Sequence, residues 1–116
     1  MNGRAIVEKM FSIIDEREFD RLNEVFHFEV IYQRPGYQEI EGLSDLIHFY
    51  KNVRIITCGL HTIKEVISDG ATIVCKGYFQ GKSGKGEMLE TRFSDYYQLK
   101  DGKISRRETY FFQPHI

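Results

Sequence analysis

Asp95 is the residue of this sequence best suited to proton-transfer chemistry, because it stands among aromatic residues on a segment with strand-like alternation. Side chains alternate along a strand, so Phe93 and Tyr97 share the face of Asp95. A carboxyl group that loses solvation among rings can act as a general acid or base near neutral pH. The alternative is that Asp95 forms a structural ion pair with Arg34 or Arg107.

Four further residues are candidates for holding a ligand. Tyr32 and Arg34 lie on the same face of a short β-rich segment, where Arg34 can bind a carboxylate or enolate in two-point fashion and Tyr32 can donate its hydroxyl. His61, at the start of a long predicted strand, is the histidine expected to face a cavity, and Tyr97 shares the face of Asp95. The alternatives are that Arg34 is a surface residue before a turn and that His61 has only a structural role.

The histidines and cysteines have no spacing typical of a metal site, so we predict no metal ion and no cofactor. Cys58 and Cys75 are too far apart for a CxxC pair or a disulfide framework, and read as reduced residues. The segment 81–83 has a partial likeness to a phosphate loop, but its spacing is wrong and it joins two strands. It is therefore interpreted as a hairpin tip.

Length and charge limit the remaining classes. The 116 residues fit a single domain spanning 1–116. Sixteen basic and seventeen acidic residues give a formal net charge of −1, which offers no general attraction to nucleic acid or to an anionic membrane. No uncharged stretch approaches the roughly 18 apolar residues of a membrane span. We expect a cytoplasmic protein that binds neither nucleic acid nor membranes.

The elements that must position these side chains fall into two groups, which differ in the periodicity of their apolar residues. The three-and-four spacing of apolar residues predicts helices over 4–15, 19–26 and 43–53, with a strand at 28–32 that ends at a Pro-Gly turn. Beyond them, alternation and glycine turns predict four long strands, over 55–68, 71–80, 87–99 and 103–113. Helices followed by an antiparallel meander indicate an α+β fold.

Aromatic residues make up 14% of the chain and are often adjacent, at 78–79, 96–97 and 110–112. Neighbouring rings on a strand point to opposite faces, so both faces of the predicted sheet must be covered. The helices can cover only one face, and a second subunit or a curled sheet must cover the other. We therefore predict a homodimer through a sheet face, the alternative being tyrosines that lie flat on the surface.

The order of these segments resembles the nuclear transport factor 2-like superfamily, which includes ketosteroid isomerases and SnoaL-like polyketide cyclases. The likeness is carried by residues 32–36, 46–50, 61–67, 93–97 and 101–104 and covers nearly the whole chain. The resemblance implies a single SnoaL-like domain whose cone-like, curved antiparallel sheet packs against three N-terminal helices. It also implies a pocket for a small, partly apolar ligand.

The isomerases' functional residues carry over in part. Arg34 stands where those enzymes have a shuttle carboxylate, Met10 stands near their enolate-binding tyrosine, and Asp95 matches their protonated aspartic acid. The second aspartate of epoxide-hydrolase members would fall near Thr109. The resemblance implies a cofactor-free isomerase or polyketide cyclase acting by proton transfer. The missing carboxylate leaves open a non-catalytic ligand-binding or protein-interaction member.

Overall fold

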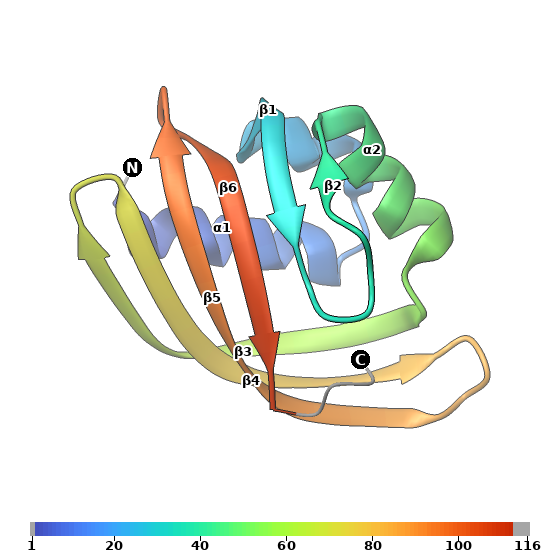
Figure 1. The fold of residues 1–116 in the computed structure, drawn as a ribbon. Helices are drawn as coiled ribbons and strands as arrows, with labels where there is room; N and C mark the ends of the chain where they lie inside the picture. The colour runs from blue at the N-terminus through green and yellow to red at the C-terminus, as the bar shows by residue number, and fades with distance from the viewer. Residues whose placement is uncertain (1, 113–116) are drawn as a thin grey trace.

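The first helix is the best-predicted element of the chain. The computed structural model describes residues 2–112 (Figure 1) and begins with helix α1, Gly3–Asp15. The Asn2 side chain caps it by accepting a hydrogen bond from the Ala5 amide at 2.8 Å. The buried side of α1 carries the predicted stripe: Ile6, Val7, Met10, Phe11, Ile13 and Ile14.

The predicted helix over 19–26 is wrong in type and length. The segment η1, Phe19–Glu24, is a 3₁₀-helix, and Phe26 already belongs to strand β1, Phe26–Gln33. Phe19 and Leu22 are nevertheless buried as expected. A spacing of three residues satisfies a 3₁₀-helix as well as one turn of an α-helix, so periodicity alone does not separate the two.

The third predicted helix is present but changes character halfway. Helix α2, Leu43–His48, continues as η2, Phe49–Val53, which has the wider hydrogen bonding of a π-helix. Its last turn closes with the Arg54 amide donating to the Phe49 carbonyl at 2.9 Å. Such wide turns are often found near functional sites. This one buries the Tyr50 ring on the sheet side of the helix.

The four long strands of the meander are confirmed as β3 (Ile56–Asp69), β4 (Thr72–Ser83), β5 (Met88–Lys100) and β6 (Lys103–Phe111). The sheet has the order β2-β1-β6-β5-β4-β3, and its curved surface carries the helices on one face (Figure 1). The α+β fold class and curved sheet are therefore confirmed.

Two details of the sheet correct the prediction. A short strand β2, Ile40–Glu41, which the sequence analysis did not anticipate, pairs with β1 at the edge. Strand β1 runs parallel to β6, so the sheet is not antiparallel throughout. The long connection between β1 and β6 passes through helices and permits either parallel or antiparallel pairing, whereas a hairpin turn permits only antiparallel pairing.

Bulges and a glycine accommodate the strong curvature of β3 and β4. The β3 register shifts between Ile56 and Cys58 and again between Ile63 and Glu65. Gly77 of β4 lies opposite Ile63, and a Cβ there would collide with the Thr62 carbonyl oxygen. The neighbouring backbone can approach this closely only because residue 77 has no side chain.

The faces of the sheet follow the predicted alternation. Phe93, Asp95 and Tyr97 are buried on the helix side of β5, whereas Arg92 and Ser94 are exposed on the other side. Within residues 2–112, no helix is long and apolar enough to cross a membrane.

Candidate functional site

Asp95 is the centre of a buried ion pair. Its Oδ2 accepts hydrogen bonds from Arg107 Nη2 at 3.0 Å and Nε at 3.2 Å, and from the Tyr97 hydroxyl at 2.6 Å. Its Oδ1 accepts from the Thr109 hydroxyl at 2.6 Å. The expected alternative of an ion pair with Arg107 is therefore the observed arrangement. Strand pairing creates it, because Asp95 lies opposite Thr109 and Tyr97 lies opposite Arg107.

Arg107 connects this ion pair to the helices. Its Nη1 donates to the Tyr50 hydroxyl at 2.9 Å, and its guanidinium lies 4.6 Å from the centre of the Tyr32 ring. Burial lowers the pKa of Arg107, but the combined attraction of Asp95 and of the neighbouring Tyr32, Tyr50 and Tyr97 more than offsets this and holds the pKa above its ordinary value. Arg107 is thus a fixed cation.

A chain of hydroxyl groups leads from Asp95 to Tyr32. The Tyr32 hydroxyl lies 2.8 Å from Thr109 Oγ1, and Arg34 Nη1 donates to the Tyr32 oxygen at 3.4 Å. Because Thr109 gives its proton to Asp95, Tyr32 must be the donor in the Tyr32–Thr109 bond. Burial raises the pKa of Tyr32, which keeps its phenol protonated.

These groups border a small cavity that is lined by residues of the strands and their connections. Its volume is about 10 Å³, room for about one water molecule. Three of the predicted ligand residues, Tyr32, Arg34 and His61, line it, whereas Asp95 and Tyr97 lie one layer behind. The described lining residues are Tyr32, Arg34, Arg54, Ile56, His61, Phe79, Phe93, Arg107, Thr109 and Phe111.

Arg54 is a lining residue that sequence analysis missed. Its Nε is buried and has no hydrogen-bond partner among residues 2–112, and its guanidinium lies over the rings of Tyr50 and Phe79. Burial lowers the pKa of Arg54 to about 10. Arg54 stands in the irregular junction between η2 and β3, where no periodicity assigns a face, so the sequence carries no signal for it.

His61 faces the cavity as predicted, although it lies within β3 rather than at its start. Its Nδ1 is 2.6 Å from Asp15 Oδ1, and its backbone amide donates to Asp15 Oδ2 at 2.8 Å. This contact was not predicted, because in the sequence Asp15 is only the last residue of the first predicted helix. The pair ties the end of α1 to the sheet.

The His61 environment predicts a pH dependence of stability. Burial lowers the pKa of His61 from 6.5, although Asp15 opposes the shift. Below that pH the unfolded chain binds a proton at residue 61 that the folded protein does not, so the free energy of unfolding should fall as pH drops through about 6.5. Urea unfolding at several pH values should show a weaker fall in His61→Gln. An unchanged slope in that variant would contradict the prediction.

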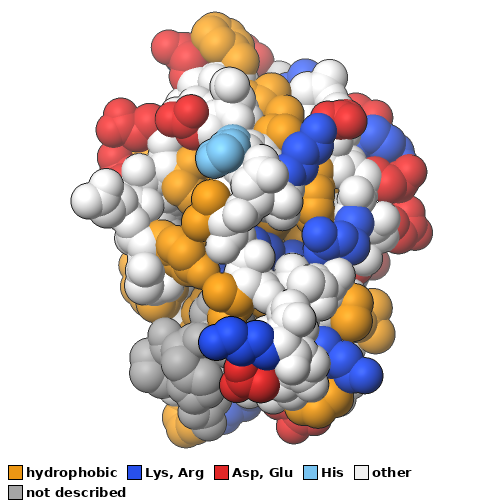
Figure 2. All heavy atoms as spheres, turned by 90° about the vertical axis from the view of Figure 1, so that its right-hand side faces the viewer, with side chains coloured by type: hydrophobic (Ala, Val, Ile, Leu, Met, Phe, Trp, Pro, Cys, Tyr) orange, Lys and Arg blue, Asp and Glu red, His pale blue; other side chains and the backbone are white. Residues whose placement is uncertain are grey.

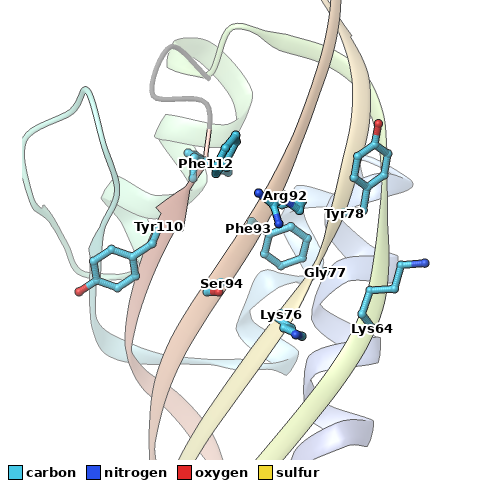
Figure 3. A pocket seen from close by; sticks show the side chains of 10 residues that line it. Lys64, Lys76, Gly77, Tyr78, Arg92, Phe93, Ser94, Tyr110 and Phe112 are labelled. Atoms are coloured by element: carbon cyan, nitrogen blue, oxygen red, sulfur yellow. The ribbon is translucent and has the colours of Figure 1, made fainter.

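A larger groove lies on the opposite face of the sheet. It has a volume of about 720 Å³ and is lined by side chains of β3 to β6, including Lys76, Tyr78, Arg92 and Tyr110. Figure 3 shows these side chains on the side of the strands that faces away from the helices. Another view of the surface shows acidic and basic groups interspersed with exposed hydrophobic ones (Figure 2).

Comparisons with known proteins identify one family. The family model for a SnoaL-like domain matches residues 7–107 of the chain. None of the curated proteins matches it.

Solved structures resemble the fold at low sequence identity. A nuclear transport factor 2-like protein of unknown function from Burkholderia pseudomallei is 18% identical, with a TM-score of 0.85, covering 96% of this chain and 91% of its own. An LEH-like epoxide hydrolase from M. tuberculosis is 17% identical, with a TM-score of 0.80, covering 92% of this chain and 80% of its own.

A third similar structure was solved with a small molecule. This protein from Catenulispora acidiphila has a ketosteroid isomerase-like fold and was crystallised in complex with trimethylamine. It is 12% identical, with a TM-score of 0.82, and covers 90% of this chain and 83% of its own. At these identities, the three structures establish the fold and leave the chemistry to the residues of the site.

Proposed function

Because the chain belongs to the SnoaL-like domain family, we propose that it binds a small, partly apolar organic molecule at the cavity on the helix side of the sheet. The lining side chains must move apart to admit it, because the space of about 10 Å³ holds about one water molecule. The observation that carries this proposal is the contrast between the walls of that cavity. Arg34 and Arg107 supply hydrogen-bond donors on one part, the Tyr32 oxygen supplies an acceptor, and Phe79 and Phe93 supply rings elsewhere. Donors beside rings suit a compact molecule with a carbonyl or carboxylate group.

The proposed chemistry is cofactor-free proton transfer of the isomerase or cyclase type. Arg34 donates to a ligand oxygen, the Tyr32 oxygen accepts from an acidic ligand group, and Asp95 is the proton acceptor at the end of the hydroxyl chain. When a ligand group gives a proton to the Tyr32 oxygen, Tyr32 passes its own proton to Thr109, and Thr109 passes its proton to Asp95. Tyr97 and Arg107 hold the Asp95 carboxylate in position.

The alternative is a non-catalytic member of the family that binds a ligand or another protein. Two observations favour it: the small cavity, and Arg34 in the place of the isomerases' carboxylate. Once a substrate is known, Asp95→Asn separates the two functions, since unchanged turnover would remove the acid/base role. We also propose a cytoplasmic location, as expected from the sequence, which would place the ligand among the metabolites of that compartment.

Benzoate is a suitable probe of ligand binding, because it joins one carboxylate to one ring. Arg34→Gln should weaken benzoate binding about 10- to 100-fold, since a hydrogen bond to a charged group contributes about 1.5–3 kcal/mol. Titration calorimetry measures the two affinities. Arg4→Gln, on the exposed side of α1, is the matched control and should bind like the wild type. Equal affinity in Arg34→Gln would contradict the proposed site.

We also propose that the outer face of the sheet binds a second copy of this chain. Three apolar or aromatic residues there are strongly exposed: Val74 at 42%, Tyr110 at 58% and Phe112 at 66%. A partner sheet would cover them and fill the groove of about 720 Å³.

Light scattering should give the mass of a dimer for the wild type and of a monomer for Tyr110→Asp. A charge introduced at the centre of an apolar interface is desolvated without a partner, which opposes association. Lys9→Glu on helix α1 is the control and should remain dimeric. A monomeric wild type would contradict the proposed dimer, but it would not bear on the proposed ligand site.

A further inference from the structure

The groove on the outer face of the sheet, away from the helices, is lined by basic side chains and by no acidic ones. Its volume of about 720 Å³ lies within the range of about 300–1,000 Å³ that is usual for ligand pockets. The basic residues are Lys64, Lys76 and Arg92, and none of the described lining residues is Asp or Glu. A concave surface with charges of one sign attracts ligands of the opposite sign, so an anion complements this groove.

Strand register builds the groove around a small residue. Ser94 of β5 lies opposite Lys76 of β4 on one side and opposite Tyr110 of β6 on the other. Two residues along the same face, Tyr78 of β4 lies opposite Arg92 of β5. The short Ser94 side chain therefore stands among longer ones, which leaves the surface hollow at this point (Figure 3).

The basic side chains of the groove are available to a ligand. Lys64 and Arg92 form no ion pair within residues 2–112. Lys76 Nζ lies 4.0 Å from Glu65 Oε1, but the two side chains are 63% and 55% exposed, and exposed pairs of this kind contribute little. An anion can therefore contact the three basic groups without breaking a strong ion pair.

Aromatic rings supply the apolar part of the groove. The guanidinium carbon of Arg92 lies 4.3 Å from the centre of the Phe112 ring, so a cation and a ring stand side by side. Tyr110 and Phe112 are strongly exposed, and Tyr78 is partly exposed. Uncovered rings beside cations suit a flat ligand that stacks on a ring while its acid group contacts a cation.

The width of the groove indicates a ligand larger than one ring. Side chains of the four strands β3 to β6 line it, and neighbouring strands lie about 4.8 Å apart, so its two sides are about 14 Å from each other. Two fused rings with an acid group fit this width. The cavity on the helix side of the sheet has a volume of only about 10 Å³, so the two sites differ in the size of the ligand they accept.

We propose that the outer groove binds a flat aromatic acid, a carboxylate or sulfonate with at least two fused rings. The acid group accepts hydrogen bonds from Arg92 and Lys76, and the rings lie over Ser94 between Tyr78 and Tyr110. All of these side chains belong to one chain, so the site is complete without a partner.

The aromatic acid competes with a second copy of the chain, a consequence that rests on the dimer proposed above. A partner sheet that fills the groove leaves no space for the acid. A two-fold interface also brings a patch of one chain against the same patch of its partner, so the basic side chains of the two grooves approach one another and weaken the dimer. The acid should therefore convert dimers into monomers.

Titration calorimetry with 2-naphthalenesulfonate tests the groove. Arg92→Gln should bind this probe about 5- to 10-fold more weakly than the wild type, because a charged contact at an exposed site contributes less than a buried one. Arg106→Gln is the matched control, since Arg106 lies outside the groove beside Glu108, and it should bind like the wild type. Equal affinities for the wild type and Arg92→Gln, or a wild type that does not bind the probe, overturn the proposal.

An uncharged ligand of the same shape separates the contribution of charge from that of the rings. The wild type should bind 2-naphthalenesulfonamide more weakly than the sulfonate, and Arg92→Gln should bind the two with more similar affinities. If the wild type binds both equally well, the groove does not recognise the acid group and the proposal is wrong.

Arg34→Gln separates the groove from the cavity on the helix side of the sheet. This variant should lose benzoate binding, as proposed above, and should bind 2-naphthalenesulfonate like the wild type. Weaker binding of the sulfonate to Arg34→Gln but not to Arg92→Gln would place the probe in that cavity and overturn the groove site. Loss of benzoate binding alone would concern only the proposed function.

Light scattering tests the competition. Saturating 2-naphthalenesulfonate should change the mass of the wild type from that of a dimer to that of a monomer. A protein that stays dimeric with the probe bound overturns the competition. A wild type that is monomeric without any ligand removes the proposed dimer, and the calorimetry then decides whether the groove is the site.

Discussion

Asp95→Asn is expected to lower the free energy of unfolding by about 3–5 kcal/mol, the usual cost of removing one partner from a buried ion pair. The loss is large because Arg107 would keep its charge in a site where only 3% of the residue is exposed. The amide also supplies donors where Tyr97 and Thr109 now donate, so those bonds are disturbed too. Urea unfolding followed by circular dichroism measures the change.

A double variant provides the control for this result. Replacing Asp95 by leucine and Arg107 by methionine removes both charges together, and similar replacements of buried ion pairs are often neutral or stabilising. The double variant should therefore be clearly more stable than Asp95→Asn. A loss below about 1 kcal/mol in Asp95→Asn would show that Arg107 is not held by this carboxylate.

Gly77→Ala is expected to destabilise the protein by about 1–3 kcal/mol, the usual cost of forcing extra atoms into a packed site. The added Cβ would collide with the Thr62 carbonyl and would lie 2.9 Å from Cζ of Phe93. Backbone cannot yield as a flexible side chain does, so the curved part of β3 and β4 would have to shift.

Gly84→Ala is the matched control for residue 77, because its Cβ would meet only Thr57 Cγ2 at an ordinary 3.5 Å. Its stability should lie within about 0.5 kcal/mol of the wild type, as is usual for surface substitutions. If both alanine variants unfold at the same urea concentration, Gly77 is not what permits the close approach of β3 and β4.

Local sequence patterns were sufficient to predict most of the helices and strands. Alternation and Asp-Gly turns identified the meander, and the apolar stripe identified the first helix. The features that escaped prediction depend on partners distant in sequence. β2 is two residues long, and the parallel pairing of β1 with β6 joins strands about 75 residues apart, as in the Tyr32–Arg107 register pair.

The site was predictable where strand parity sufficed. Parity placed Asp95 and Tyr97 on the inner face, yet it could not choose between Arg34 and Arg107 as the ion-pair partner, which required the β5–β6 register. Strand parity also could not reveal that the Tyr97 hydroxyl donates its hydrogen bond to Asp95 instead of to a ligand. Asp15 meets His61 across 46 residues, a contact that only the packing of α1 on β3 creates.

The adjacent rings show both the strength and the limit of the sequence reasoning. Parity separates Phe79 and Tyr97, which are buried on the helix side, from Tyr110, which is exposed on the other side. The buried rings proved to fill most of the inner space, which leaves a cavity far smaller than the groove outside. Residue counts and parity do not measure the volume that remains between side chains.

Native mass spectrometry of the wild type and Arg34→Gln, each with and without benzoate, is the most direct test of a ligand site between sheet and helices. The wild type should gain the mass of one benzoate per chain, and any molecule retained from its source should leave as benzoate binds. Arg34→Gln should show little of either. A wild-type protein that carries no small molecule and gains none at saturating benzoate would contradict the proposed site.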